Sequence, residues 1–270
     1  MSCMTHDFGA SARLAPPAVL SITAFDPSCC TGLGAEIKTA AVLGCHLLSG
    51  VTACDLRGSG GELRPLPVAE LRRSLEAMAA EFKPQAVHVG ELATAEIAAA
   101  VAEFLESLHG VAVVLGPLRG GELREADAAR QRLLRLASVA TLNAEAAASV
   151  AGAEAAGDTR HRAAEKILEL GAAAVVVTGG SLDPADDLLL MRGQDGALYE
   201  ETFPAEKIVC DGVLGAGCSF AVALACGLTK GSEMTAAVFD AKFYTGEALR
   251  HAVAREHGRS SLNHLWKLYR

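Results

Sequence analysis

The sequence predicts an α/β fold in which a mainly parallel central sheet carries helices on both faces. Three observations indicate this fold. Short, β-branched apolar runs alternate with longer segments of helical spacing, the runs have the continuous hydrophobicity of buried strands, and loops of unusual chemistry follow them. With 270 residues and one unbroken apolar pattern, we expect a single domain over residues 17–270, preceded by a loose leader over residues 1–16.

Each expected element has a local reason. The expected strands cover residues 17–25, 46–54, 85–90, 111–116, 138–143 and 172–180, and residues 186–203 predict a hairpin with "QDG" as its turn. The expected helices cover residues 33–44, 67–82, 94–108, 127–137, 163–171, 214–228 and 236–253, and the alanine-rich residues 143–158 predict helix plus loop. The turn signal "DPS" ends the first strand, Pro67 opens the second helix, Thr94 caps the third and Gly171 closes the fifth.

Composition and charge exclude several classes of protein. The chain is 51% hydrophobic and 21% charged, which argues against disorder. A net charge of −8 argues against a nucleic-acid or anionic-membrane partner, and no apolar run reaches the roughly 18–20 residues that span a bilayer. The N-terminus has no apolar signal core, and the eight cysteines are irregularly spaced with no CxxC pair. We therefore expect a cytoplasmic protein with reduced thiols, among which Cys210 and Cys226 are core residues.

Several common functional motifs do not occur in this sequence. It has no P-loop "GxxxxGK[ST]", no "GxGxxG" after the first strand and no "GxSxG". The histidines show no metal-binding spacing, and we expect them at the surface or as satisfied core residues. A nucleotide would therefore have to be held in another way.

The stretch "LGAGCSFAVALACGL", residues 214–228, places a cysteine at the mouth of a helix. The backbone N–H groups of Gly215, Ala216 and Gly217 suit the terminal group of a phosphoryl donor, because a helix N-terminus favours anions. An alcohol acceptor must lose its proton there, and the helix N-terminus favours the thiolate form of Cys218, which makes Cys218 a candidate base. The alternative is structural, since glycines and a small cysteine also permit close packing of a helix against a strand.

The order of the motifs resembles that of a known family. "DPSCCTGLGAEIKT" (residues 26–39) stands where that family has "DPSGGAGxxADxKT", and "GAGC" (residues 215–218) matches its "GTGC". "VTGG" (residues 177–180) and the helix "DAKFYTGEAL" (residues 240–249) follow the same order. The chain resembles the ribokinase-like superfamily and, within it, the hydroxymethylpyrimidine/phosphomethylpyrimidine kinases of thiamine biosynthesis.

This resemblance implies ATP-dependent phosphorylation of hydroxymethylpyrimidine or its monophosphate, with Mg²⁺ as the metal and a homodimer as the assembly. The implied roles are Cys218 as the base; Gly215, Ala216 and Gly217 as the anion hole; Asn143, Thr178, Gly180 and Lys242 at ATP; Ala24, Asp26, Cys54 and Glu91 at the pyrimidine; and Glu145 at the metal.

Some positions depart from the family pattern. Cys29 and Cys30 replace two glycines, Cys54 replaces a pyrimidine-binding glutamine, Glu91 replaces a methionine, Gly116 replaces an aspartate, and Glu145 stands one residue early. A thiol in place of an amide removes two hydrogen bonds to the pyrimidine. A missing carboxylate weakens the hold on Mg²⁺, which prefers oxygen ligands. We therefore expect slow catalysis that improves in Gly116→Asp.

Three functions stay open at this point: a kinase for a hydroxymethyl heterocycle, a pyridoxal-type vitamer kinase of the same fold, and a diverged paralogue that binds a ligand with little catalysis. The glycine-cysteine turn favours the two kinases, whereas the altered pocket favours the paralogue. Arg57, in the glycine-rich loop 57–62, and Arg119 are each either a solvated charge or a phosphate clamp, and Glu91 is either solvated or a substrate ligand.

Overall fold

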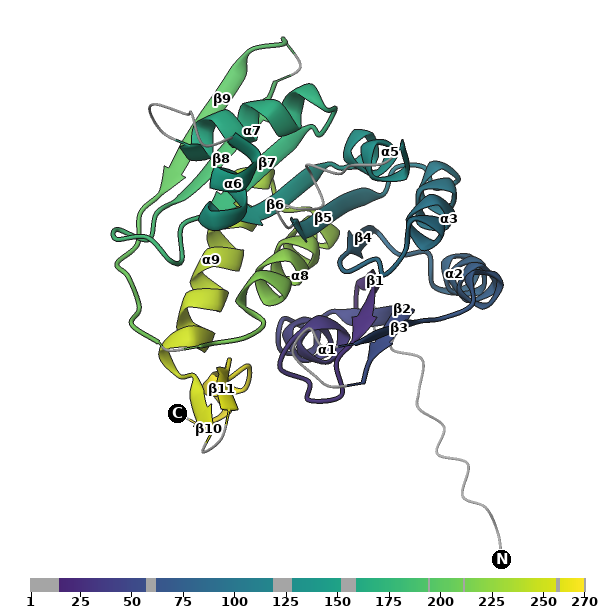
Figure 1. Ribbon diagram of the computed structural model, residues 1–270, viewed down its shortest axis with the longest axis horizontal. Coiled ribbons are helices and arrows are strands. Elements are labelled where there is room, and N and C mark those ends of the chain that lie inside the picture. The colour runs from purple at the N-terminus through teal and green to yellow at the C-terminus, as the bar shows by residue number, and fades with distance from the viewer. Residues whose placement is uncertain are drawn as a thin grey trace, which may run out of the picture.

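The computed structural model describes residues 15–56, 62–118, 128–151, 159–193, 195–210, 212–255 and 258–269. Residues 1–14 of the predicted leader, and the positions of Arg57 and Arg119, lie outside these ranges. Figure 1 shows the described part as a curved sheet with helices packed along it.

The sheet has nine strands among the described residues, in the order β3-β2-β1-β4-β5-β6-β7-β8-β9. In chain order the strands are β1 (Ala18–Phe25), β2 (His46–Asp55), β3 (Leu63–Pro65), β4 (Ala86–Val89), β5 (Ala112–Leu118), β6 (Val139–Asn143), β7 (Ala174–Thr178), β8 (Asp187–Arg192) and β9 (Leu198–Phe203). The strands from β2 through β7 in that order pair in parallel, whereas β3 and β8 are antiparallel to their neighbours. The predicted mainly parallel sheet is confirmed.

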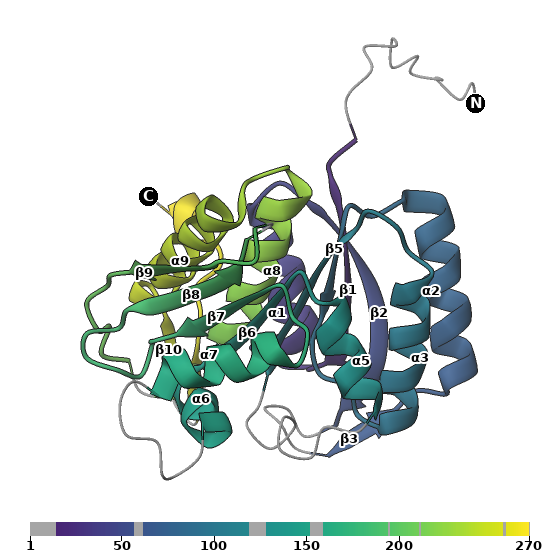
Figure 2. The same cartoon turned by 90° about the horizontal axis from the view of Figure 1, so that it is seen from above.

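Helices cover both faces of this sheet, as predicted. They are α1 (Gly32–Val42), α2 (Val68–Phe82), α3 (Ala95–Glu106), α5 (Ala128–Leu136), α6 (Ala144–Ala151), α7 (Thr159–Glu169), α8 (Ala216–Thr229) and α9 (Met234–Arg250). One hydrophobic core joins the sheet to α2, α3, α5, α6 and α7, and a second core joins the other face to α1, α8 and α9. Figure 2 shows the sheet between these two layers.

The local signals explain where several elements begin and end. Thr94 caps α3, because its side chain accepts a hydrogen bond from the backbone N–H of Ile97 at 3.2 Å. Pro67 is the N-cap of α2, and Gly171 follows α7 with φ +115°, a backbone conformation that favours glycine. The predicted hairpin is β8–β9, and β9 runs in the direction of β7 because both pair antiparallel to β8.

The C-terminal segment was not predicted to contain strands. Beyond α9 the chain forms β10 (Val253–Arg255) and β11 (Gly258–Ser261), paired antiparallel, and then the 3-10 helix η1 (Trp266–Tyr269). The short edge strand β3 was also missed. The missed strands (LRP, VAR and GRSS) lack the apolar run by which the equally short β4 (AVHV) was predicted. No helix in the described ranges is both long enough and apolar enough to cross a membrane.

Candidate active site

The glycine-cysteine turn opens α8, and its geometry requires glycine at the first position. Gly215 has φ +87°, and a Cβ built there would lie 2.1 Å from the backbone oxygen of Cys30. The turn therefore packs directly on the loop that follows β1. The first N–H groups of a helix have no partner within the helix, so those of Ala216, Gly217 and Cys218 are the natural donors to an anion at this mouth.

The C-terminal segment holds this turn in place from the other side. The backbone N–H of Leu214 donates to the backbone oxygen of Ser260 at 3.0 Å. Leu262 and Trp266 are buried in a small core against which Ala216 also packs. Sequence reasoning gave these residues no role, because they lie more than 40 positions from the motif that they support.

The Cys218 thiol is half-buried and contacts the loop after β1. Its Sγ lies 3.3 Å from Oγ1 of Thr31, and either atom can be the donor. Sequence reasoning missed Thr31. The available signal was its place in "DPSCCTG", where the resembling motif has alanine.

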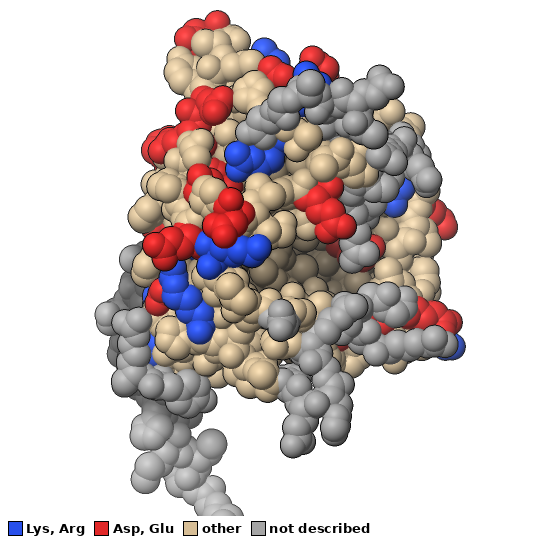
Figure 3. Space-filling view, turned by 60° about the vertical axis from the view of Figure 1, so that its left-hand side comes forward, with Lys and Arg blue, Asp and Glu red and all other residues tan. Residues whose placement is uncertain are grey.

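A cavity of about 320 Å³ leads to the glycine-cysteine turn and contains most of the expected nucleotide residues. Thr178, Gly180 and Lys242 line it together with Ala216 and Gly217. Its apolar lining is formed by Phe203, Ile208, Phe220, Phe239, Phe243 and Leu249. The face shown in Figure 3 is hollowed near its centre, with uncharged surface in the hollow and charges of both signs around it. A cavity with an apolar wall and N–H donors at its end suits a nucleoside triphosphate.

Lys242 reaches this cavity from α9 and is already paired. Its Nζ lies 2.9 Å from Oδ1 of Asp187 and donates to the backbone oxygen of Ala185 at 2.9 Å. Burial raises the pKa of Asp187, and this is opposed by the charge of Lys242 and by the N–H of Gly179. Lys242 therefore places one positive charge in the cavity and also fixes the connection between β7 and β8.

The expected anion hole predicts a steric sensitivity at Gly217. A Cβ there would lie 3.1 Å from the side chain of Pro117, so the branched side chain of Gly217→Val must displace the ring or the start of α8. We expect at least a tenfold loss of ATP affinity by calorimetry, because the N–H donors move with the backbone. The melting temperature of the unliganded variant is the control for misfolding. Unchanged affinity would place the nucleotide elsewhere and favour the packing interpretation of the turn.

The residues expected at the acceptor lie at the carboxyl ends of neighbouring strands. Ala24 is buried near the end of β1, Cys54 pairs with Phe25 near the end of β2, and Glu91 follows β4. The backbone of Glu91 is held on both sides, because its N–H donates to Oγ1 of Thr23 at 3.0 Å and its oxygen accepts from Oγ1 of Thr52 at 2.7 Å. The structure thus brings these three residues together at the end of the sheet where the parallel strands finish.

Asp26 shapes the loop that carries Thr31. Its carboxylate accepts hydrogen bonds from the backbone N–H of Ser28 at 2.8 Å, from the Ser28 hydroxyl at 2.6 Å and from the backbone N–H of Thr31 at 3.1 Å. Cys29 has φ +54°, where the resembling motif has glycine, and Lys38 donates to its backbone oxygen at 2.6 Å. Cys29 thus adopts a left-handed backbone conformation that ordinarily favours glycine.

The structure argues on steric grounds against the expectation for Gly116→Asp. Gly116 has φ +135°, and a Cβ there would lie 2.5 Å from both the backbone oxygen and Oγ1 of Thr141. Since no side chain fits without a change of backbone, an aspartate at this position cannot simply restore a metal ligand. Sequence comparison cannot detect this, because it compares residue types and not backbone conformations.

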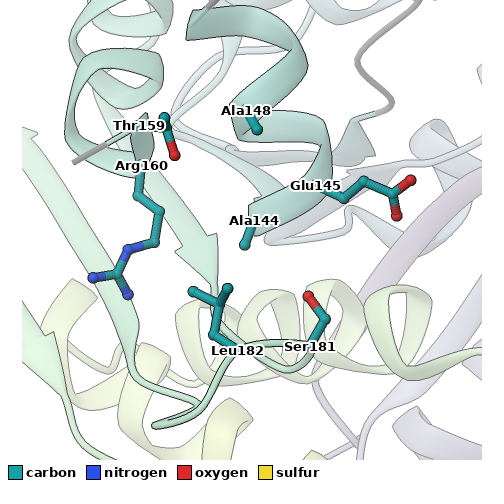
Figure 4. A pocket seen from close by; sticks show the side chains of 7 residues that line it. All are labelled: Ala144, Glu145, Ala148, Thr159, Arg160, Ser181 and Leu182. Atoms are coloured by element: carbon teal, nitrogen blue, oxygen red, sulfur yellow. The ribbon is translucent and has the colours of Figure 1, made fainter. Parts of the chain in front are cut away.

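Neither Asn143 nor Glu145 lines the 320 Å³ cavity, although Asn143 pairs with Thr178, which does. Oδ1 of Asn143 accepts from the backbone N–H of Ala146 at 2.7 Å and so caps α6. Glu145 lines a different cavity of about 490 Å³ together with Arg160, and in Figure 4 their charged ends point to opposite sides. No group of three or more His, Cys, Asp or Glu within the described ranges has the arrangement of a metal site. Such a group is not required for Mg²⁺ that binds with a nucleotide, because the phosphates and waters supply most of its ligands.

A fully buried polar network lies beneath the site and joins four elements. Ser21 of β1 donates to Oε2 of Glu36 on α1, and Nδ1 of His88 on β4 lies 3.0 Å from the Ser21 hydroxyl and 3.5 Å from the same carboxylate oxygen. Nε2 of His88 lies 2.7 Å from the backbone oxygen of Gly116 on β5. Burial lowers the pKa of His88, but Glu36 and the Gly116 oxygen more than offset this, and the net pKa is raised. His88 is the satisfied core histidine that the sequence predicts.

This fold and site define a ribokinase-like kinase of small molecules. The model of the phosphomethylpyrimidine kinase family matches residues 26–263. The chain belongs to this family.

Individual relatives support the same assignment. The chain is 34% identical to a hydroxymethylpyrimidine/phosphomethylpyrimidine kinase of Streptomyces coelicolor, over 94% of this chain and 96% of that protein. Among solved structures, it is similar to a Bacillus subtilis pyridoxal kinase in complex with ADP (TM-score 0.82, 25% identity, 94% of this chain and 100% of the other). It is also similar to a Clostridium difficile phosphomethylpyrimidine kinase (TM-score 0.68, 25% identity, 86% and 99%).

Proposed function

We propose that the chain transfers the terminal phosphoryl group of ATP either to the hydroxymethyl group of hydroxymethylpyrimidine or to the phosphate group of its monophosphate. One observation carries this proposal: the Cys218 thiol stands at the start of α8, directly after Ala216 and Gly217, which line the same cavity as Lys242. A base and a set of anion donors therefore meet at one point.

The proposed reaction uses this meeting point directly. With the alcohol as acceptor, its hydroxyl oxygen attacks the terminal phosphorus in line, its proton passes to the Cys218 thiolate, and the bond to the ADP oxygen breaks. The N–H groups of Ala216 and Gly217 stabilise the charge on the transferring group. Mg²⁺ is proposed only as a companion of the ATP phosphates, since a nucleotide brings most ligands of such an ion.

A pyridoxal-type vitamer is the second candidate acceptor. The observation that favours it is the higher TM-score with the pyridoxal kinase than with the phosphomethylpyrimidine kinase, 0.82 against 0.68. Cys54, at the position of the expected pyrimidine-binding glutamine, removes an amide that would read the pyrimidine.

The test compares acceptors on the purified protein with ATP and Mg²⁺. We expect phosphorylated product, measured by mass spectrometry, with the highest kcat/KM for hydroxymethylpyrimidine or its monophosphate, and loss of turnover when excess EDTA removes the metal. A higher kcat/KM for pyridoxal would select the second candidate. No product from any of the three acceptors would contradict both and leave the diverged binding protein. Sedimentation of the same sample tests the homodimer.

A further inference from the structure

The threonine beside Cys218 is used in an unusual way for a helix-capping residue. Thr31 is the N-cap of α1, with the extended backbone of a capping residue, yet its side chain makes no capping hydrogen bond. Thr94, in the same position on α3, accepts from the N–H of Ile97 as capping threonines do. The Thr31 hydroxyl instead lies 3.3 Å from the Cys218 sulfur, 187 positions along the chain.

Several contacts hold the Thr31 hydroxyl in that place. The Asp26 carboxylate accepts from the backbone N–H of Thr31, and the Cys30 oxygen lies where a Cβ of Gly215 would be. The hydrogen bond to Asp26 fixes the backbone of Thr31. The close approach of Cys30 to Gly215 holds the loop against the turn that carries Cys218. The distance between the Thr31 hydroxyl and the Cys218 sulfur is therefore determined by the packing of the loop after β1 against the turn that opens α8.

We propose that Thr31 is a positioning residue for Cys218, whose hydroxyl orients the sulfur and stabilises its thiolate. The base role of Cys218 rests on the proposed function, but the contact with Thr31 does not. A hydroxyl can donate and accept, so it donates to the thiolate before proton transfer and accepts from the S–H afterwards. One contact thus serves both protonation states, and hydrogen bonds to the charged state are the stronger ones.

Other charged groups near this pair are engaged by the loop itself. The Asp26 carboxylate accepts hydrogen bonds from Ser28 and Thr31, and the Lys38 ammonium donates to the backbone oxygen of Cys29. Cys30, which belongs to the same loop, is buried. These groups stay unchanged when only the Thr31 hydroxyl is removed, so a substitution there isolates the contact.

The experiment measures alkylation of Cys218 by iodoacetamide as a function of pH, with the peptide that contains residue 218 quantified by mass spectrometry. The variants are Thr31→Val, which keeps the shape and removes the hydroxyl, and Thr31→Ser, which keeps the hydroxyl. Thr94→Val is the matched control, because it removes a threonine that does cap its helix. Thr31→Ala, which has the residue of the resembling motif, replaces Thr31→Val if that variant fails to fold.

We expect the midpoint of the alkylation profile to move up by about one pH unit in Thr31→Val, with about a tenfold lower rate at neutral pH. Thr31→Ser retains the wild-type profile. Thr94→Val lowers the melting temperature but leaves the profile unchanged, whereas Thr31→Val changes the melting temperature less, because its hydroxyl does not cap α1. The same midpoint in Thr31→Val and the wild type overturns the proposal, as does failure of Thr31→Ser to retain it.

This assay needs no substrate, so it separates the two proposals. If no acceptor is phosphorylated but the alkylation midpoint still depends on the hydroxyl, the proposed function fails and the contact between Thr31 and Cys218 stands. If the protein is active but the midpoint is insensitive to Thr31, the positioning role fails alone. In an active protein, the acidic limb of the kcat profile should move with the alkylation midpoint while the KM for ATP stays constant.

Discussion

Cys218→Ala is expected to lower kcat by about a hundredfold or more, the usual scale for loss of a general base. The KM for ATP should change little, because the anion donors of the turn are backbone N–H groups that the substitution retains. Steady-state kinetics with varied ATP at a saturating acceptor concentration measures both kcat and the KM for ATP. Cys218→Ser keeps the size of the side chain and should be similarly slow, since a hydroxyl is a far weaker base than a thiolate at neutral pH.

The control for this prediction is the melting temperature of both variants. Cys218 is half-buried at the mouth of a helix, so its replacement by alanine removes little packed volume. A variant that melts with the wild type but turns over slowly supports the base. Retention of most of the turnover in Cys218→Ala would show that the thiol takes no proton and that the small cysteine serves packing.

Glu36→Gln is expected to destabilise the protein by about 3–5 kcal/mol, the cost of breaking a buried ion pair at one partner. Both side chains of the pair are fully buried, and the imidazole of His88 also bonds the Gly116 oxygen through its other nitrogen. The amide keeps the shape of the carboxylate but cannot balance an imidazolium. Urea denaturation followed by circular dichroism measures the change in unfolding free energy.

A double-mutant cycle with His88→Gln separates the interaction free energy between Glu36 and His88 from the other effects of replacing each residue. The double variant should lose less stability than the sum of the two single variants, because no buried charge is left unpaired. Glu103→Gln is the matched control: it removes the same group from an exposed pair with Arg72 and should have little effect. Additive losses in the cycle would mean that Glu36 and His88 do not interact as a pair.

The same pair predicts how stability depends on pH. The folded-state pKa of His88 is raised above its ordinary value of 6.5, so its contribution is fully present below that value and is lost as the pH rises through the folded-state pKa. The wild type should therefore lose more unfolding free energy than His88→Gln between pH 6 and pH 9. Parallel profiles for the two proteins would contradict this assignment.

The sequence was sufficient for the fold because its signals are local and repeated. Apolar runs such as those of β1 and β7, and stop signals such as Thr94 and Gly171, act over a few residues. The resemblance added the order of the motifs, which predicted that Thr178, Gly180 and Lys242 would meet near the glycine-cysteine turn. The structure places all three in one cavity with Ala216 and Gly217.

The remaining features depend on contacts between distant segments or on backbone conformation. The approach of Thr31 to Cys218 joins positions 187 apart, and the replacement of the motif's alanine by Thr31 does not by itself indicate which residue Thr31 contacts. The steric exclusion at Gly116 depends on a φ of +135° and on the neighbouring strand. The network of Glu36 and His88 joins a helix to a strand 52 positions later, although each residue alone is unremarkable in the sequence.

The strand order has a consequence for how such a protein can change its substrate over evolution. β1, β2 and β4 carry the residues expected at the acceptor, whereas β7 and its connection to β8, together with α8 and α9, line the cavity expected for the nucleotide. If the proposed function holds, mutations on the first set would alter which acceptor is phosphorylated while the residues that bind the phosphoryl donor stay unchanged. Thr31, which follows β1, and Cys218, which lies on α8, would then connect the acceptor half of the site to the donor half.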